Sequence, residues 1–151
     1  MTTTARSAPV GAKIDDGFST LFAFAADPDI ALWEKNVKPP GIDGGDPIDI
    51  TTMHNTDWRT FAPPQLKTLT PMNVTCAYDP AVYDQIAAIL ATVGWITCHF
   101  ADGSTLDFVG YLKSFEPNDI SEGEQPTASV VIQPTNILAG VEEEPVYTAA
   151  V

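Results

Sequence analysis

Apolar and polar residues alternate with a period of two through most of the chain, and this pattern predicts β-strands. In the stretch MNVTCAY, Met72, Val74 and Cys76 fall on one face, and smaller or polar residues fall between them. Other stretches repeat the alternation or are short and apolar between turn residues. Strands are therefore expected over residues 17–25, 30–37, 48–52, 58–62, 72–78, 95–100, 105–115 and 127–134.

One segment has a helical period instead. Asp79 is a natural N-cap, and Pro80 suits the first helical position because its missing N–H has no partner there. Apolar residues recur four positions before and after Ile86, which places them on a single stripe. Gly94 is a plausible stop signal. Together these features predict one amphipathic helix over residues 80–92.

The connections complete the expected fold. Asp102–Gly103 is a hairpin signal between two strands, and residues 116–126 form a polar, acidic loop. The prolines and glycines of residues 38–47 exclude both helix and strand, so a long loop begins there. We therefore expect an antiparallel β-sandwich or barrel with one flanking α-helix. The expected organisation is an N-terminal arm (1–16), a β-sandwich domain (17–137) and a C-terminal tail (138–151).

The long loop or hairpin, residues 38–62, contains most of the residues whose side chains could take part in chemistry or in contacts with a partner. Trp58 lies between polar turns and Pro63, where it is poorly placed to reach the main core, so an interface is favoured. Arg59 could bind a carboxylate of a neighbouring subunit or stay solvated, and both remain open. The candidate contact residues of this loop are Pro39, Pro40, Ile42, Ile48, Ile50, His54, Trp58, Arg59 and Phe61.

Charge narrows the classes of partner. The formal net charge is −13, from 20 acids against 7 bases. Proteins that bind nucleic acid through phosphates need clustered Lys and Arg, and no basic run suggests an anionic membrane. No apolar run reaches the ~18 residues that span a bilayer, and the first residues do not resemble a secretory signal. The expectation is a soluble product of the cytoplasm.

A search for catalytic or metal-binding patterns gives nothing. His54 and His99 each precede an aspartate by three residues, and residues so spaced on a strand point to opposite faces. No nucleophile or phosphate-loop motif occurs. Cys76 and Cys98 lie within apolar strand patterns, which predicts two buried thiols rather than a disulfide. We expect no catalytic, cofactor or metal site, and no enzyme activity.

Several segments, taken in order, carry a family pattern. They are GFSTLFAFA, PIDITTMHNTDWRTFAP, the VTCAYDPAVY entry to the helix, and WITCHFADGSTLDFVGYLKSF. The most specific parts are IDITT leading through Arg59 to FAP, the Tyr78-Asp79-Pro80 helix entry, and the FADGSTLDFVGYLKSF hairpin. Over about residues 14–137 the chain resembles the major tail tube protein of long, flexible-tailed (siphovirus-type) bacteriophages.

The resemblance implies a small β-sandwich whose copies form hexameric rings, stacked into a hollow tube for genome delivery into the host. It implies contacts between subunits through loop 38–62 and the N-terminal arm, although the adjacent Pro39 and Pro40 depart from the family and stiffen the loop base. The implied partners are further copies, tape-measure, tail terminator and baseplate proteins, and passing double-stranded DNA that is not specifically bound. The implied location is the virion tail, with assembly in the host cytoplasm.

Two alternatives stay open. The same architecture is similar to ring proteins of contractile tails and of the type VI secretion apparatus. A small β-barrel enzyme or ligand-binding module would instead require a deep pocket lined by His54 or His99.

Overall fold

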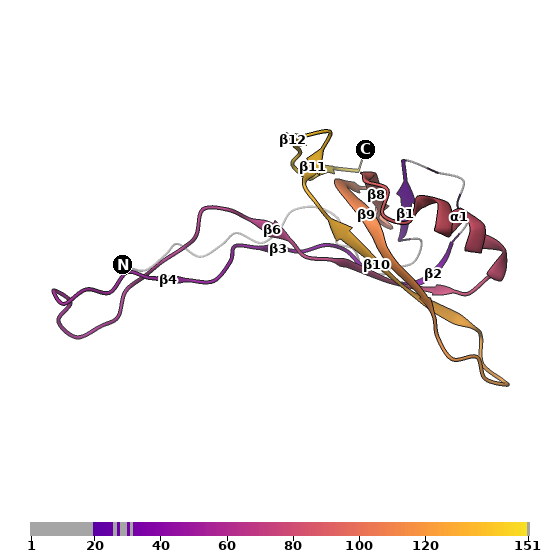
Figure 1. The fold of residues 1–151 in the computed structure, drawn as a ribbon, viewed down its shortest axis with the longest axis horizontal. Coiled ribbons are helices and arrows are strands. Elements are labelled where there is room, and N and C mark those ends of the chain that lie inside the picture. The colour runs from indigo at the N-terminus through magenta and orange to yellow at the C-terminus, as the bar shows by residue number, and fades with distance from the viewer. Residues whose placement is uncertain (1–19, 26, 28–29, 31, 151) are drawn as a thin grey trace.

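A computed structural model describes residues 20–25, 27, 30 and 32–150. The expected N-terminal arm, residues 1–16, and the start of the first predicted strand lie outside the described residues. The prediction of a mainly antiparallel β fold with one short helix is confirmed. Figure 1 shows a sheet-and-helix body with a long segment projecting on the left and the end of the β9–β10 hairpin extending at the lower right.

Seven strands form the main sheet, in the order β1-β8-β9-β10-β7-β2, with β13 added on β9. All of its strand pairs are antiparallel. The strands are β1 (Leu21–Phe24), β2 (Trp33–Lys38), β7 (Met72–Ala77), β8 (Gly94–His99), β9 (Thr105–Pro117), β10 (Thr127–Pro134) and β13 (Val146–Thr148). The last of these lies in the stretch expected to be a C-terminal tail.

The longest strand, β9, connects two parts of the sheet. Its first half, up to Gly110, pairs with β8, and its second half, from Gly110 onward, pairs with β10. Strand β13 pairs with residues 105–107 of β9. An ideal Cβ on Gly110 would lie 2.6 Å from the carbonyl oxygen of Gln133, so only glycine allows β10 to approach this closely.

The helical segment begins as predicted and ends earlier. The Asp79 carboxylate accepts a hydrogen bond from the Ala81 N–H at 3.0 Å, and a 3-10 turn, η1 (Pro80–Val82), leads into α1 (Tyr83–Ile89). The predicted range of 80–92 was too long. Leu90 leaves the helix because it bridges to Leu112, and the Ala91 N–H donates to the Leu112 carbonyl at 3.2 Å.

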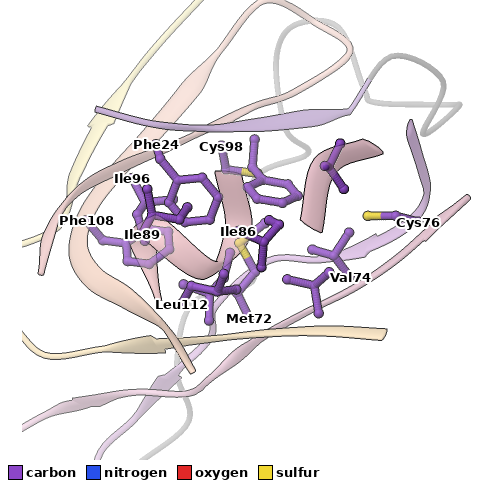
Figure 2. Packing of buried hydrophobic residues seen from close by; sticks show 14 of the residues in the cluster. Phe24, Met72, Val74, Cys76, Ile86, Ile89, Ile96, Cys98, Phe108 and Leu112 are labelled. Atoms are coloured by element: carbon purple, nitrogen blue, oxygen red, sulfur yellow. The ribbon is translucent and has the colours of Figure 1, made fainter. Parts of the chain in front are cut away.

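Apolar side chains from the sheet and α1 meet in one core. Figure 2 shows Ile86 and Ile89 of α1 directed into the same cluster as Phe24, Ile96 and Phe108. The alternation expected in β7 is confirmed, because its alternate residues Met72, Val74 and Cys76 are buried. The core therefore lies between α1 and one face of the curved sheet.

The prediction of two buried thiols is also confirmed, since Cys76 and Cys98 are both free and buried. Burial, and secondarily the negative charge of Glu34, raise the pKa of Cys76 to about 12 and that of Cys98 to about 11. Both side chains consequently behave as small apolar groups of the core.

The connection between β2 and β7, residues 39–71, is the projecting segment of Figure 1, and we call it the arm. It holds two short strand pairs: β3 (Ile42–Asp43) with β6 (Thr68–Leu69), and β4 (Ile48–Asp49) with β5 (Phe61–Ala62). A separate hairpin of β11 (Ile137–Leu138) and β12 (Val141–Glu142) follows β10. No helix in the described part of the chain is long and apolar enough to cross a membrane.

Candidate functional site

The arm is the candidate site, because it gathers the candidate contact residues away from the core. Its base is held by mutual hydrogen bonds between Gly41 and Thr70. The Gly41 N–H donates to Thr70 Oγ1 at 2.7 Å, and the Thr70 N–H donates to the Gly41 carbonyl at 2.9 Å. The expected strands over 48–52 and 58–62 are shorter than predicted, and the paired ribbon continues past residue 62 to Leu69.

Polar side chains hold the outer part of the arm in shape. The Ile50 N–H donates to the Thr60 carbonyl at 3.0 Å, and the Thr60 N–H donates to Thr51 Oγ1 at 2.9 Å. Asn55 closes the tip, since its Oδ1 accepts from the Thr52 N–H at 2.9 Å. Over residues 51–60 the backbone is irregular, and these bonds take the place of regular hydrogen bonds between strands. The period-two pattern therefore overestimated the length of both strands.

Arg59 pairs with Asp49 of its own arm. The guanidinium Nη1 lies 3.2 Å from Asp49 Oδ2, and both side chains are substantially exposed. Hydrogen bonds from Thr51, and then from Arg59, hold the pKa of Asp49 below its ordinary value of 3.8. In the isolated chain, the carboxylate partner of Arg59 is therefore internal to the arm.

The two faces of the β4–β5 ribbon differ in character. Residues directly opposite in an antiparallel pair share a face, so Ile48 and Ala62 lie on one face, while Asp49 and Phe61 lie on the other. Alternation adds Ile50 to the first face and Arg59 to the second. One face is thus aliphatic, and the opposite face carries an ion pair beside an aromatic ring.

Most of the predicted contact residues are exposed, and the two at the base are not. Trp58 is 83% exposed, and Ile42, Ile48, Ile50 and Phe61 are also exposed. His54 is exposed at the tip, with its backbone N–H donating to Thr52 Oγ1. At the arm base Pro39 is half-buried and Pro40 is buried. In the isolated chain they therefore pack within the protein and are not free contact residues.

Two further apolar side chains on the arm were missed from sequence. Met53 is 100% exposed and Leu66 is 84% exposed. Large apolar residues within a stretch so rich in proline and polar residues could have identified them, because such a stretch cannot bury them itself.

The arm offers no arrangement suited to catalysis on a metal. Among the described residues, no group of three or more His, Cys, Asp or Glu side chains could hold a metal ion. The arm's own chemistry is that of a surface: aliphatic and aromatic groups beside polar ones, which is the composition of protein–protein contacts.

Comparisons with known proteins bear on the fold. No known family matches the sequence, and no curated protein sequence matches it. A chain of the "Virion of native gene transfer agent (GTA) particle" superposes with a TM-score of 0.61 at 14% identity, covering 89% of this chain and 99% of that one. A chain of the "Tail of empty GTA particle computed with helical refinement, C6 symmetry" has a TM-score of 0.54 at 10% identity, covering 78% and 84%.

These two likenesses show a shared fold. The sequence identities are too low to transfer a residue role from either chain. The shared fold includes most of the chain.

Proposed function

We infer that this chain is a structural subunit of a virion tail tube. Copies of it form hexameric rings, and the rings stack into a hollow conduit for genome delivery into a host cell. The observation that carries this proposal is the fold shared with chains of a gene transfer agent virion and of a C6-symmetric tail. The resemblance of the sequence to tail tube proteins of flexible-tailed phages points in the same direction.

The arm supplies the physical means of assembly. A two-stranded ribbon is marginally stable alone in water, and this one exposes Ile48, Ile50 and Trp58 to solvent. Covering those side chains with another copy would remove apolar surface from water and order the ribbon. Ile42, His54, Arg59 and Phe61 stay among the proposed contact residues, while Pro39 and Pro40 would set the angle at which the arm leaves the body.

The shape favours contacts that differ on the two partners. The arm projects from one side of the body. If it paired only with the same arm of a partner, part of the contact surface would stay uncovered. Arm-to-body contacts that the partner does not return are heterologous, and heterologous contacts generate closed rings or open stacks. The proposed partners are accordingly further copies first, and then the tape-measure, tail terminator and baseplate proteins of a virion tail.

The competing ligand-binding function has little support in the described residues. The more prominent surface grooves are open, and neither is lined by His54 or His99. A small-molecule site would instead be a largely enclosed cavity with convergent polar groups.

Electron microscopy of the purified protein tests the proposal. At high concentration, or with a nucleating tail-tip complex, wild-type protein should form rings with six-fold symmetry and stacked tubes. Trp58→Ala should keep the far-UV circular dichroism of the fold but reduce tube formation about tenfold or more, because interface tryptophans commonly contribute 2 kcal/mol or more, as an order of magnitude.

The matched control is Tyr83→Ala, which removes an exposed aromatic side chain from α1 instead of the arm. It should assemble like the wild type. Particles that stay monomeric under every condition would overturn the proposed function. Loss of the folded signal in Trp58→Ala would show that Trp58 serves the fold of the monomer.

A further inference from the structure

A groove lies where the root of the arm meets the segment that follows β12. Its volume is about 440 Å³, and its walls include Ile42 of β3, and Gln65 and Leu66 just before β6. Ile42 and Leu66 are largely exposed, so they are apolar walls that the described residues leave uncovered.

The acidic side of the groove is built into the fold. Glu142, Glu143 and Glu144 line it, and Lys67 lines it from the arm, which gives 1 base against 3 acids and a net charge of −2. The Glu143 N–H donates to the Asn136 carbonyl at 2.8 Å, and Asn136 Nδ2 donates to the Glu143 carbonyl at 3.4 Å. The backbone of the acidic run is therefore fixed against the end of β10.

A partner for this groove should be cationic and partly apolar. The arm of another copy does not fit, because residues 39–71 hold 2 bases against 4 acids, a net charge of −2. The β9–β10 loop, residues 116–126, holds acids and no base. Residues 1–13 differ from both, since they hold Arg6, Lys13 and no acid, whereas residues 14–151 hold 5 bases and 20 acids.

We propose that the groove at the arm root binds the N-terminal segment, residues 1–13. Arg6 and Lys13 engage the glutamates, with the guanidinium able to form paired hydrogen bonds to a carboxylate. Pro9 and Val10 lie between the two bases and cover the apolar walls. The 14 Cα-to-Cα steps from Arg6 to Thr20 can span up to ~45 Å, more than the ~30 Å diameter of a small domain. Residues 1–13 can thus reach past the body.

Cysteine cross-linking of the full-length protein tests this assignment. The variant pair Ser7→Cys with Gln65→Cys places one thiol in the segment and one in the groove without changing any charge. The native thiols do not compete, because Cys76 and Cys98 are buried with raised pKa values. Disulfide formation should be at least about 5-fold faster than in the matched control, because docking concentrates the two thiols.

The control pair is Ser7→Cys with Gln125→Cys, which puts the second thiol in the acidic β9–β10 loop next to Glu124. An internal cross-link supports the proposal, and so does a dimer whose disulfide joins position 7 of one copy to position 65 of the other, as mapped by peptide mass spectrometry. Equal rates for the two pairs would overturn it.

Charge reversal supplies an independent check. Arg6→Glu with Lys13→Glu in the groove pair should slow cross-linking about 5-fold or more, and added salt should slow the unreversed pair. Adding Glu142→Lys and Glu144→Lys should restore the rate. A cross-linking rate that charge reversal does not change would show that Arg6 and Lys13 do not engage the glutamates. That result would refute residues 1–13 as the occupant of the groove. These rates are measured on unassembled protein, so their failure would leave the tail tube proposal intact.

Discussion

Asp49 organises the outer part of the arm at the scale of single residues. Its carboxylate accepts a hydrogen bond from the Thr51 N–H at 2.9 Å and faces the Arg59 guanidinium. The ion pair is exposed on both sides, and exposed pairs contribute little free energy. The value of Asp49 lies in holding the local backbone shape and in keeping Arg59 on the face opposite Ile48 and Ile50.

This role gives a pH dependence with a definite sign. The folded arm lowers the pKa of Asp49 below 3.8, so it favours the ionised form. The stabilisation is fully present above pH 3.8 and is lost as pH falls through the lower folded value. The amide resonance of Thr51 should therefore titrate in acid in the wild type, and Asp49→Asn should remove that titration at unchanged overall fold.

The matched control for that titration is Asp57→Asn, an exposed aspartate of the same arm. It should leave the Thr51 titration intact. A Thr51 resonance that titrates alike in wild type and Asp49→Asn would mean that the arm does not use this carboxylate.

At the scale of elements, β9 determines how the sheet is assembled. It exchanges β8 for β10 as its pairing partner at Gly110, and Gly94 and Pro134 both lie opposite that residue. Any side chain at Gly110 would press on the backbone of Gln133 and Pro134, which cannot rotate away as a side chain can. The register of β10 therefore depends on residue 110 being glycine, which has no Cβ.

Gly110→Ala should destabilise the protein by about 1–3 kcal/mol, the usual cost of forcing atoms into a packed site. Gly94→Ala is the matched control, because Gly94 is the β8 residue paired with Gly110 and a Cβ there meets nothing within 4 Å. Urea denaturation of both variants measures the difference. Equal midpoints for the two variants would contradict the close packing at Gly110.

Strand positions were predictable where burial alone decides them. The alternation predicted for β7 matched the structure, and β10 has the predicted bounds of 127–134, because one face of each strand is in the core. The end of α1 was not predictable, because Leu90 leaves the helix for a tertiary contact with Leu112 of β9. No local pattern encodes a partner 22 residues away, and the pairing of β13 with β9 has the same cause.

The candidate site was predictable in location and not in detail. Prolines, glycines and apolar residues that the segment could not bury marked the arm as a segment outside the core. The sequence could not show that Arg59 pairs with Asp49, because that contact depends on the register of β4 against β5. It also left the groove beside Glu143 unseen, since its walls come from residues far apart in the chain.

At the scale of the whole molecule, the net charge determines whether the protein attracts or repels DNA. With a net charge of −13, copies arranged in the proposed tube would repel phosphate, and the sequence has no cluster of Lys and Arg whose binding to DNA would release counterions. We expect no binding of a short labelled duplex by fluorescence anisotropy at low salt, where nonspecific binding is strongest. Salt-sensitive binding would contradict a conduit along which DNA slides freely.

The anchoring of the arm has a mechanical consequence. The arm leaves the body from β2 and returns through β7, and these two strands are hydrogen-bonded neighbours. Tension applied to the arm along those strands would have to shear β7 against β10, which are paired over six residues from Met72 to Ala77. Shear loads those hydrogen bonds together rather than one after another. A pull on the arm would therefore load this ribbon without peeling the sheet apart.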